Sequence, residues 1–506
     1  MDTSRTFGRR SSWQSSPLID PAYELRQLHA HELHAQKTAT HPSPTHPPTQ
    51  PSEQQRIQKS FVASQEQAHG LYVLADADTF YASCERVFHP ELAHVPVVVL
   101  SNNDGCVVTR SAEAKPYVPK GVPWFQIREE ATEQGAVARS SNYELYGSLS
   151  QRMMHLMHRY FAHQEVYSID ECFLHTTKPE DEAIRIAQKM RDAVWRGIGI
   201  PLSVGVAPTK TLAKIVNHWA KHGHGHDHVS SWDRMDREQR EALLTVTPVS
   251  DVWGIGRRLT RRLVARGIVT AYDLREANLV DLRSRFGVCV ARTVLELRGV
   301  PCITDEANAD GGVRKDSILC SRMFGHYVQG AEPLKQALGV YIQDACRRLR
   351  RQQSIAWRVS FFIGPPFNRH ADEYSIPLQF VELASPSDDP LVFIHALSST
   401  HLLDSIDPHL RWSRAGIMLI GIIAADSYHP LPQTDFRAKR DTRGIGELLD
   451  RANSRFGDHS VGIGWSGIRG KGRNSNETGA SWNMRREMLS PRCTTRWDEL
   501  PVVRAN

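Results

Sequence analysis

Short apolar runs recur along the chain, separated by longer stretches in which apolar and polar residues alternate at helical spacing. The runs occupy residues 71–76, 96–100, 166–169 and 202–207. Runs of four to six apolar residues between polar segments are typical of strands in a buried sheet. Residues 144–161 and 181–196 instead repeat apolar positions every three or four residues, which predicts helices. The alternation predicts an α+β domain over residues 69–230.

A second α+β pattern follows further along the chain. A basic helical region covers residues 231–300, and a polar gap separates it from the next patterned segment, 317–425. That segment is predicted to contain a long Arg-rich helix at 331–352 and strands near 355–363 and 415–423. Residues 426–506 are rich in Gly, Ser and Arg, with weak periodicity. We expect that segment to be a poorly patterned tail.

The first 68 residues have a different composition. They are rich in Pro, His, Gln, Ser and Thr, as in HPSPTHPPTQ, and contain few apolar residues. Such a segment cannot bury enough apolar surface to fold, so residues 1–68 are predicted to be a disordered extension. A start codon assigned too far upstream would explain the same composition.

Composition narrows the class of protein. A chain of 506 residues predicts about three or four domains, and 40% hydrophobic with 23% charged residues is typical of soluble globular proteins. The 62 Lys and Arg against 56 Asp and Glu give a net charge of +6, which allows a polyanionic partner without proving one. The longest apolar run, 415–425, is too short to cross a membrane, and no signal peptide is evident.

The cysteines indicate a compartment. Eight are scattered along the chain without a CxxC pair: Cys84, Cys106, Cys172, Cys289, Cys302, Cys320, Cys346 and Cys493. Closely spaced pairs are typical of zinc sites, and paired spacings are typical of disulfide scaffolds. The sequence therefore predicts reduced thiols and a cytoplasmic location.

Three carboxylates carry the clearest chemistry. Asp76 ends the first apolar run, and Asp170 and Glu171 are adjacent. Neighbouring residues of a regular strand point to opposite faces, so the adjacent pair can share a ligand only at a strand end or turn, which predicts a hairpin near 170–171. Three unpaired carboxylates would repel one another, and two Mg²⁺ ions would remove that repulsion. The alternative is a solvated acidic pair at a turn.

Several motifs surround these carboxylates in a characteristic order. They are DADTFYASCE, SNNDGCVVTRSAEAK, SSNYELY, YSIDECF and VGVAPTKTLAKIVNHWAK. Together they resemble the Y-family DNA polymerases of the UmuC-like group over about residues 71–425, with a further similarity in MLSPRCTTR at 488–496. The resemblance implies a right-hand α+β architecture. Its parts are a ferredoxin-like palm with small fingers (69–230), a helix-hairpin-helix thumb (231–300), an α+β little finger (317–425) and a UmuC-type tail (426–506).

The resemblance also implies roles for the active-site residues. The metal ligands for two Mg²⁺ ions would be Asp76, Asp170, Glu171 and the main-chain carbonyl of Ala77. Phe80 and Tyr81 would lie at the nucleotide, with the Tyr81 ring excluding a 2′-hydroxyl, although plain core packing would also explain an aromatic residue there.

Basic residues are expected around the nucleotide and the DNA. Lys115 and Lys221 would contact the triphosphate, although Lys115 cannot form the bidentate contact of an arginine and Pro116 follows it. The expected DNA contacts are Lys210, Lys214, Gly254, Gly256, Arg257, Arg258, Arg322 and Arg347. Gln433 and Phe436 form a degenerate sliding-clamp motif. The alternating histidines at 222–228 are expected to form a solvated loop rather than a transition-metal site.

The predicted function is error-prone translesion DNA synthesis in the SOS response, without proofreading. The expected partners are primer-template DNA, deoxynucleoside triphosphates and, by resemblance, a UmuD-type dimer and RecA, at the nucleoid and without a membrane. Two alternatives remain open at this point. One is a DNA polymerase IV-like enzyme that acts without UmuD partners, and the other is a catalytically silent DNA-binding scaffold. The three carboxylates argue against the scaffold, because a scaffold needs no acidic cluster facing a polyanion.

Overall fold

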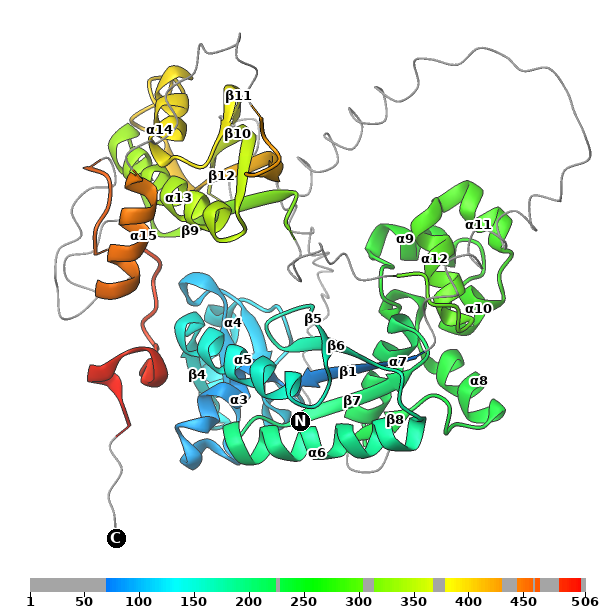
Figure 1. Cartoon of the computed structure of the whole chain (residues 1–506). Helices are drawn as coiled ribbons and strands as arrows, with labels where there is room; N and C mark the ends of the chain where they lie inside the picture. The colour runs from blue at the N-terminus through cyan, green and yellow to red at the C-terminus, as the bar shows by residue number, and fades with distance from the viewer. Residues whose placement is uncertain are drawn as a thin grey trace, which may run out of the picture. The chain divides into compact units, whose positions relative to one another are not determined.

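The computed structural model of the protein describes residues 70–223, 228–303, 314–366, 378–429, 444–457, 460–464 and 482–501 (Figure 1). It contains the mixture of helices and sheets that the sequence predicts. The described residues include no helix that is both long and apolar enough to span a bilayer. All eight cysteines are described and none forms a disulfide, as the scattered spacing predicts.

A five-stranded sheet forms the centre of the predicted palm. In order across the sheet its strands are β5 (His163–Val166), β6 (Glu171–Thr176), β1 (Leu71–Ala77), β7 (Leu202–Ala207) and β8 (Val229–Ser231). The first four strands pair antiparallel, and only β7 and β8 are parallel. Because helices separate β1 from β5 and β6 from β7, these four strands have the ferredoxin-like order.

The two faces of the palm sheet bury different helices, because successive strand residues point to opposite sides. Val73 and Ala75 of β1 join a core with the first group of helices, whereas Leu74 between them joins a core with the second. The first group is α3 (Phe80–Val87), α5 (Tyr143–His158) and α6 (Glu180–Ile198). On the second face lies α7 (Lys210–Lys221), whose core extends into the helical region that follows.

Smaller elements build the predicted fingers and thumb. The fingers sheet has the order β3 (Val107–Arg110), β2 (Val97–Leu100) and β4 (Val137–Ser140), and α4 (Trp124–Glu133) packs with it. The thumb helices are α8 (Arg237–Val246), α9 (Arg257–Val264), α10 (Ala271–Glu276), α11 (Leu279–Phe286) and α12 (Val288–Leu297). Single 3₁₀ turns lie at Pro90–Leu92, Asn102–Asp104, Ala112–Ala114, Val249–Asp251, Cys493–Thr495 and Trp497–Glu499.

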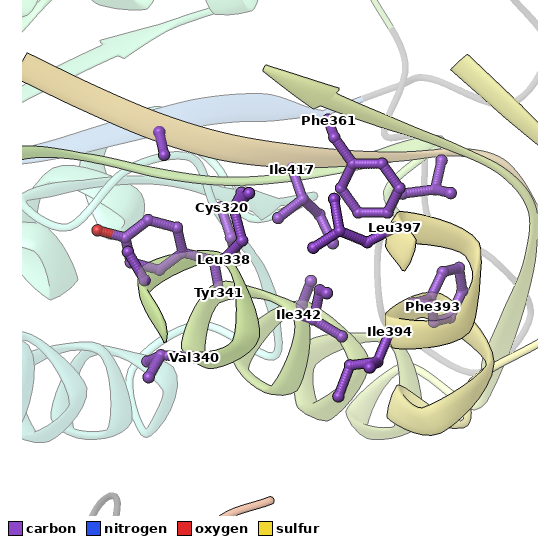
Figure 2. Close-up of a cluster of buried hydrophobic side chains, with 14 of the residues drawn as sticks. Cys320, Leu338, Val340, Tyr341, Ile342, Phe361, Phe393, Ile394, Leu397 and Ile417 are labelled. Carbon is purple, nitrogen blue, oxygen red and sulfur yellow. The ribbon is translucent and has the colours of Figure 1, made fainter. Parts of the chain in front are cut away.

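The predicted little finger is a four-stranded antiparallel sheet with helices on one face. Its strand order is β11 (Leu378–Ser387), β10 (Ser354–Gly364), β12 (Arg411–Ala424) and β9 (Ser317–Gln329). The helices are α13 (Ala331–Arg351) and α14 (Pro390–Ser399). Figure 2 shows Phe361 and Ile417 of the sheet directed toward Ile342 of α13 and Leu397 of α14. Each such buried side chain contributes about 2 kcal/mol to folding.

Two features differ from the sequence prediction. The strand predicted at 166–169 is wrong beyond its first residue, because β5 ends at Val166 and the chain then turns. The N–H groups of Tyr167 and Ser168 both donate to the Glu171 carbonyl, at 3.2 and 3.0 Å, which closes the hairpin. The weakly patterned tail also contains a helix, α15 (Ile445–Phe456). Its tie to the little finger is a side-chain contact, in which Arg350 donates to both carboxylate oxygens of Asp450 at 2.7 and 3.0 Å.

Candidate active site

The three carboxylates gather at one end of the palm sheet. Strands β1 and β6 pair so that Asp76 lies directly opposite Glu171. Directly opposite residues of an antiparallel pair place their side chains on the same face, with Cβ atoms about 5 Å apart. The N–H of Ala77 donates to the carbonyl of Asp170 at 2.9 Å, which joins the end of β1 to the hairpin turn. The predicted convergence of the acidic residues is therefore present in the fold.

The hairpin turn also fixes the Asp170 side chain. The hydroxyl of Ser168 accepts hydrogen bonds from the N–H groups of Asp170 and Glu171, at 3.2 and 3.1 Å. The same hydroxyl donates to the Asp170 carboxylate. Ser168 therefore orients both acidic residues. The sequence YSIDE alone did not indicate this role.

Three lysines of α7 face the acidic end of the sheet. Lys221 Nζ lies 2.5 Å from Asp76 Oδ1, and Lys214 Nζ lies 2.6 and 2.9 Å from the two Glu171 oxygens. Lys210 is 1% exposed and its ammonium group is 2.5 Å from Glu165 of β5. Spacings of four and seven residues place all three lysines on one side of a helix. The helix therefore supplies the compensating positive charge for the carboxylates.

Close packing sets the height of α7 above the sheet. A Cβ added at Gly205 of β7 would lie 2.3 Å from the Ala213 carbonyl oxygen and 2.4 Å from the Asn217 nitrogen. Only glycine allows the helix backbone to approach the strand this closely. The Asn217 amide then donates to the Ser203 carbonyl at 2.7 Å. These contacts determine which lysines can reach the carboxylates.

Burial controls the charge of Asp76. The pKa of Asp76 is raised from 3.8 to about 6, because burial raises it most and the charges of Glu171 and Asp170 raise it slightly, while Lys221 lowers it. The lysine therefore offsets the desolvation and the acidic neighbours only partly. An additional cation would stabilise the charged form of such a buried carboxylate.

Asp78 is a fourth carboxylate that the sequence prediction missed. Ser203 donates to its two oxygens at 2.9 and 3.0 Å, and Lys221 lies 3.9 Å away. Burial raises the pKa of Asp78, while Lys221 and, more weakly, Lys115 lower it. The spacing DAD, with Asp76 and Asp78 two residues apart, was the available signal.

The donor set suits a hard divalent cation, because carboxylate and carbonyl oxygens are the ligands that Mg²⁺ prefers. No group of three or more His, Cys, Asp and Glu side chains in the described ranges is arranged to hold a metal ion. Two of the three predicted carboxylate ligands, Asp76 and Glu171, each pair with a lysine. The carboxylate and carbonyl oxygens therefore fit a divalent metal ion in their chemistry.

Aromatic rings border the carboxylates on the α3 side. Tyr81 stacks on Tyr146 with ring centroids 4.7 Å apart and planes 17° apart, and Tyr143 meets it edge-on at 6.1 Å. Burial, with smaller effects of Tyr143 and Asp170, raises the pKa of Tyr81 to about 12, so its phenol is neutral. Phe80 is 3% exposed and belongs to the palm core. Of the predicted aromatic pair, Tyr81 is the ring placed near the acidic cluster.

Lys115 comes from the fingers. It is exposed and is the C-cap of the 3₁₀ turn Ala112–Ala114, and Pro116 follows it. Its charge lowers the pKa of Asp78, so it acts on the same site as Lys221 from another element.

Gly254 and Gly256, two of the expected DNA contacts, lie in the turn before α9. Gly254 has a φ of +86°, which favours glycine, and Gly256 is the N-cap of α9. Arg257 and Arg258 begin that helix and are exposed. Arg262 is exposed as well, and it donates to the Arg285 carbonyl at 3.1 Å within the thumb.

An aromatic cluster beside Glu171 was not predicted. Trp253, next to the thumb turn, donates to the Tyr167 hydroxyl at 3.0 Å. The Lys214 ammonium lies 4.4 Å from the centre of the Tyr167 ring and 5.6 Å from that of Trp253. Lys214 is thus positioned by rings from two elements as well as by Glu171, which no local motif indicates.

The predicted little-finger contacts share one acidic partner. Arg322 of β9 lies 3.8 Å from Asp344, and Arg347 of α13 lies 3.3 Å from it. Other predictions fall outside the described residues: the extension 1–68, Gln433 and Phe436 of the clamp motif, and His224 and His226 of the histidine-rich loop.

Two parts of the chain match models of one protein family. A model described as "impB/mucB/samB family" matches residues 75–218, and one for the C-terminal domain of that family matches 315–434. Protein UmuC of Salmonella typhimurium is 38% identical over 442 residues, which cover 86% of this chain and 100% of the relative. The chain belongs to the impB/mucB/samB family. It is a UmuC-like, Y-family DNA-directed DNA polymerase of the error-prone translesion type.

Three further matches define the extent of the similarity. DNA polymerase IV of Stenotrophomonas maltophilia (strain R551-3) is 34% identical over 217 residues, which are 42% of this chain and 58% of that protein. A solved Y-family polymerase chimera of Dbh and Dpo4 matches with a TM-score of 0.54 and 21% identity, over 70% of this chain and 99% of the other, which supports the fold. A domain of unknown function (DUF4113) matches residues 444–503. Y-family polymerases generally use divalent metal ions.

Proposed function

We propose that this polymerase extends a primer 3′ end past template damage with two Mg²⁺ ions. Asp76, Asp170, Glu171 and the carbonyl of Ala77 would hold them. The observation that carries the proposal is the register of β1 and β6, which places Asp76 opposite Glu171 beside the Asp170 turn. When bound, such ions lower the pKa of the attacking primer hydroxyl and neutralise charge on the leaving pyrophosphate.

Lys221 and Lys115 would bind the triphosphate of the incoming nucleotide. They approach one acidic site from two elements, since both lower the pKa of Asp78. Several negative charges on the triphosphate need cations in addition to the metals. Lys221 can serve this purpose once Asp76 is engaged by a metal, because the ammonium group then loses its present partner.

Tyr81 would select the sugar. Its ring is wedged against Tyr146 and lies near enough to Asp170 for that charge to influence its pKa. A ring fixed at this place leaves no space for a 2′-hydroxyl, so deoxynucleotides would be preferred. Phe80 would support this position from the core instead of touching the nucleotide.

The two lysines predicted to touch DNA fit a different role better. Lys210 is 1% exposed and binds Glu165, which favours positioning of the β5–β6 hairpin over contact with phosphate. Lys214 binds Glu171 and would reach DNA only by leaving that partner. We infer that both lysines organise the acidic site.

The DNA duplex would instead be held by the thumb and the little finger. Gly254 and Gly256 allow close approach of a phosphate to the start of α9, where Arg257 and Arg258 are exposed. On the little finger, Arg322 and Arg347 would contact the backbone. Such contacts position DNA without selecting sequence.

We expect the partners of UmuC-like polymerases to apply here as well. These are a UmuD-type dimer and RecA filaments in the SOS response, in the cytoplasm at the nucleoid. Gln433 and Phe436 would bind a sliding clamp. A DNA polymerase IV-like enzyme that acts alone remains the second candidate, supported by the 34% identity over 217 residues.

Primer extension past an abasic site tests the proposal. The full chain, Glu171→Ala and the surface variant Glu182→Gln would be compared with Mg²⁺ present. Glu182 pairs with Lys178 on the palm surface, away from the proposed metal ligands, so its variant controls for loss of an acidic side chain. We expect extension by the wild type and the control and none by Glu171→Ala. Equal extension by Glu171→Ala would refute the metal assignment.

The same assay separates the two candidates. Each reaction is run with and without a purified UmuD-type dimer and RecA filaments. Strong stimulation supports the UmuC-like assignment, whereas full activity of the chain alone supports the polymerase IV-like one.

A further inference from the structure

The last described segment of the chain, 482–501, docks into the palm and fingers. It lies within the domain of unknown function. The Met488 N–H donates to the Ser140 hydroxyl at 3.0 Å, and the Ser140 N–H donates to the Met488 carbonyl at 3.0 Å. Cys493 is 3% exposed and belongs to the palm core. Residues far apart in sequence therefore complete one interior.

Ser490 is the polar residue that this segment inserts deepest. It is 6% exposed. The Asn142 amide donates to its hydroxyl oxygen at 2.9 Å and to its carbonyl at 3.0 Å. Its hydroxyl donates in turn to Glu85 Oε1 at 3.0 Å. Because the hydroxyl both accepts and donates, its orientation is fixed and its proton is directed at the carboxylate.

Glu85 is completely buried and lies one helical turn after Tyr81 on α3. The Tyr146 hydroxyl donates to the same Oε1 atom at 2.6 Å, while Arg139 Nε is 3.6 Å from Oε2. The Tyr146 ring in turn stacks on the Tyr81 ring at 4.7 Å. A continuous set of contacts thus runs from Ser490 through Glu85 and Tyr146 to Tyr81.

We propose that Ser490 is a positioning residue for sugar selection, holding Glu85 so that Tyr146 and Tyr81 keep their stacked arrangement. The C-terminal segment thereby takes part in nucleotide choice although it is far from the carboxylates in sequence. This inference rests on the proposed role of Tyr81. A buried carboxylate that loses one of two hydrogen-bond donors on the same oxygen is under-satisfied, and it shifts to regain a partner.

Single-nucleotide incorporation by the full chain tests the proposal. For each variant, kcat/KM is measured with a deoxynucleotide and with the matching ribonucleotide. Ser490→Ala removes one hydroxyl and is expected to lower the deoxy-to-ribo ratio about tenfold, and Ser490→Thr, which keeps the hydroxyl, is expected to restore it. Thr494→Val is the matched control, because it removes a hydroxyl of the same segment that pairs with the Ser148 hydroxyl at 2.9 Å instead of with Glu85. Its ratio is expected to match the wild type.

Two more variants separate this inference from the proposed function. Tyr81→Ala is expected to lower the ratio on the order of a hundredfold, and Ser490→Ala should add nothing in that background. An unchanged ratio in Tyr81→Ala overturns the role of Tyr81, and the inference with it. A lowered ratio in Tyr81→Ala with an unchanged one in Ser490→Ala overturns the inference alone. Equal losses in Ser490→Ala and Thr494→Val also overturn it, since docking of the segment would then be the cause.

Discussion

The helices α7 of the palm and α9 of the thumb are both basic, yet their charges are used differently. In α7, Lys210, Lys214 and Lys221 each bind a carboxylate of the sheet. In α9, Arg257 and Arg261 are exposed. The difference comes from what lies beneath each helix. Both helices bury apolar residues in the same core, but α7 also faces the carboxylates at the end of the palm sheet.

This comparison shows that a run of basic residues does not by itself indicate a DNA contact. Buried ammonium groups need partners, because an unpaired charge in the interior is very costly. Lys210 is buried, and Lys214 and Lys221 are partly buried; all three contact carboxylates of the palm sheet. Only exposed basic residues remain available to release counterions from a duplex.

The largest expected effect concerns Asp76, one of the carboxylates that α7 faces. Asp76→Asn should reduce the rate of nucleotide incorporation by about a thousandfold or more, because it removes a proposed metal ligand and the partner of Lys221. Single-turnover incorporation with a normal template measures it. A loss of less than tenfold would contradict the assignment of Asp76.

The same substitution, Asp76→Asn, is expected to raise the free energy of unfolding although it lowers activity. The pKa of Asp76 in the folded chain is about 6, above its ordinary 3.8, so the folded state binds the proton more tightly. Stability should therefore fall as pH rises from about 4 to about 6 and stay lower above that range. Without metal at pH 7, Asp76→Asn should be about 2 kcal/mol more stable than the wild type. Urea unfolding in EDTA at pH 4.5 and pH 7 checks this, and equal pH dependence of both proteins would contradict it.

The next effect concerns a buried lysine of α7. Glu165→Gln removes the carboxylate charge that the buried Lys210 ammonium contacts, and we expect a loss of about 3 kcal/mol in the free energy of unfolding. The salt dependence of DNA binding should not change, because Lys210 is buried. Denaturant unfolding and DNA titrations test both points. A reduced salt slope with normal stability would restore Lys210 as a DNA contact.

The smallest expected effect concerns DNA binding by the exposed arginines of α9. Replacing Arg257 and Arg261 with alanine should weaken DNA binding about tenfold and lower the slope of log affinity against log salt by about 2. Arg262→Ala is the matched control, because Arg262 binds the Arg285 carbonyl and stacks 4.6 Å from the Phe286 ring. We expect it to reduce thumb stability and leave the slope unchanged. Fluorescence anisotropy at several salt concentrations measures both, and equal slopes for all three proteins would exclude α9 from the DNA contact.

Part of the site could be predicted from local sequence. The end of an apolar run at Asp76 and the adjacent Asp170 and Glu171 required a strand end and a hairpin, and both are present. The spacing DAD indicated Asp78. It was missed because an acidic residue directly after a strand is usually solvated. The helix α15 was missed because its tie to the little finger is the ion pair of Arg350 with Asp450, one hundred residues apart.

The sequence alone determined the α+β architecture, the acidic cluster and the family. These depend on periodicity, strand ends and ordered motifs, which are local properties of the chain. Only the tertiary structure decided which lysines pair with the carboxylates and which side chains hold the Tyr81 ring in place. Lys221 reaches Asp76 because Gly205 lets α7 approach the sheet, and Ser490 reaches Glu85 because the chain returns to the palm. Such partners lie 145 and 405 residues apart, so only folding can bring them together.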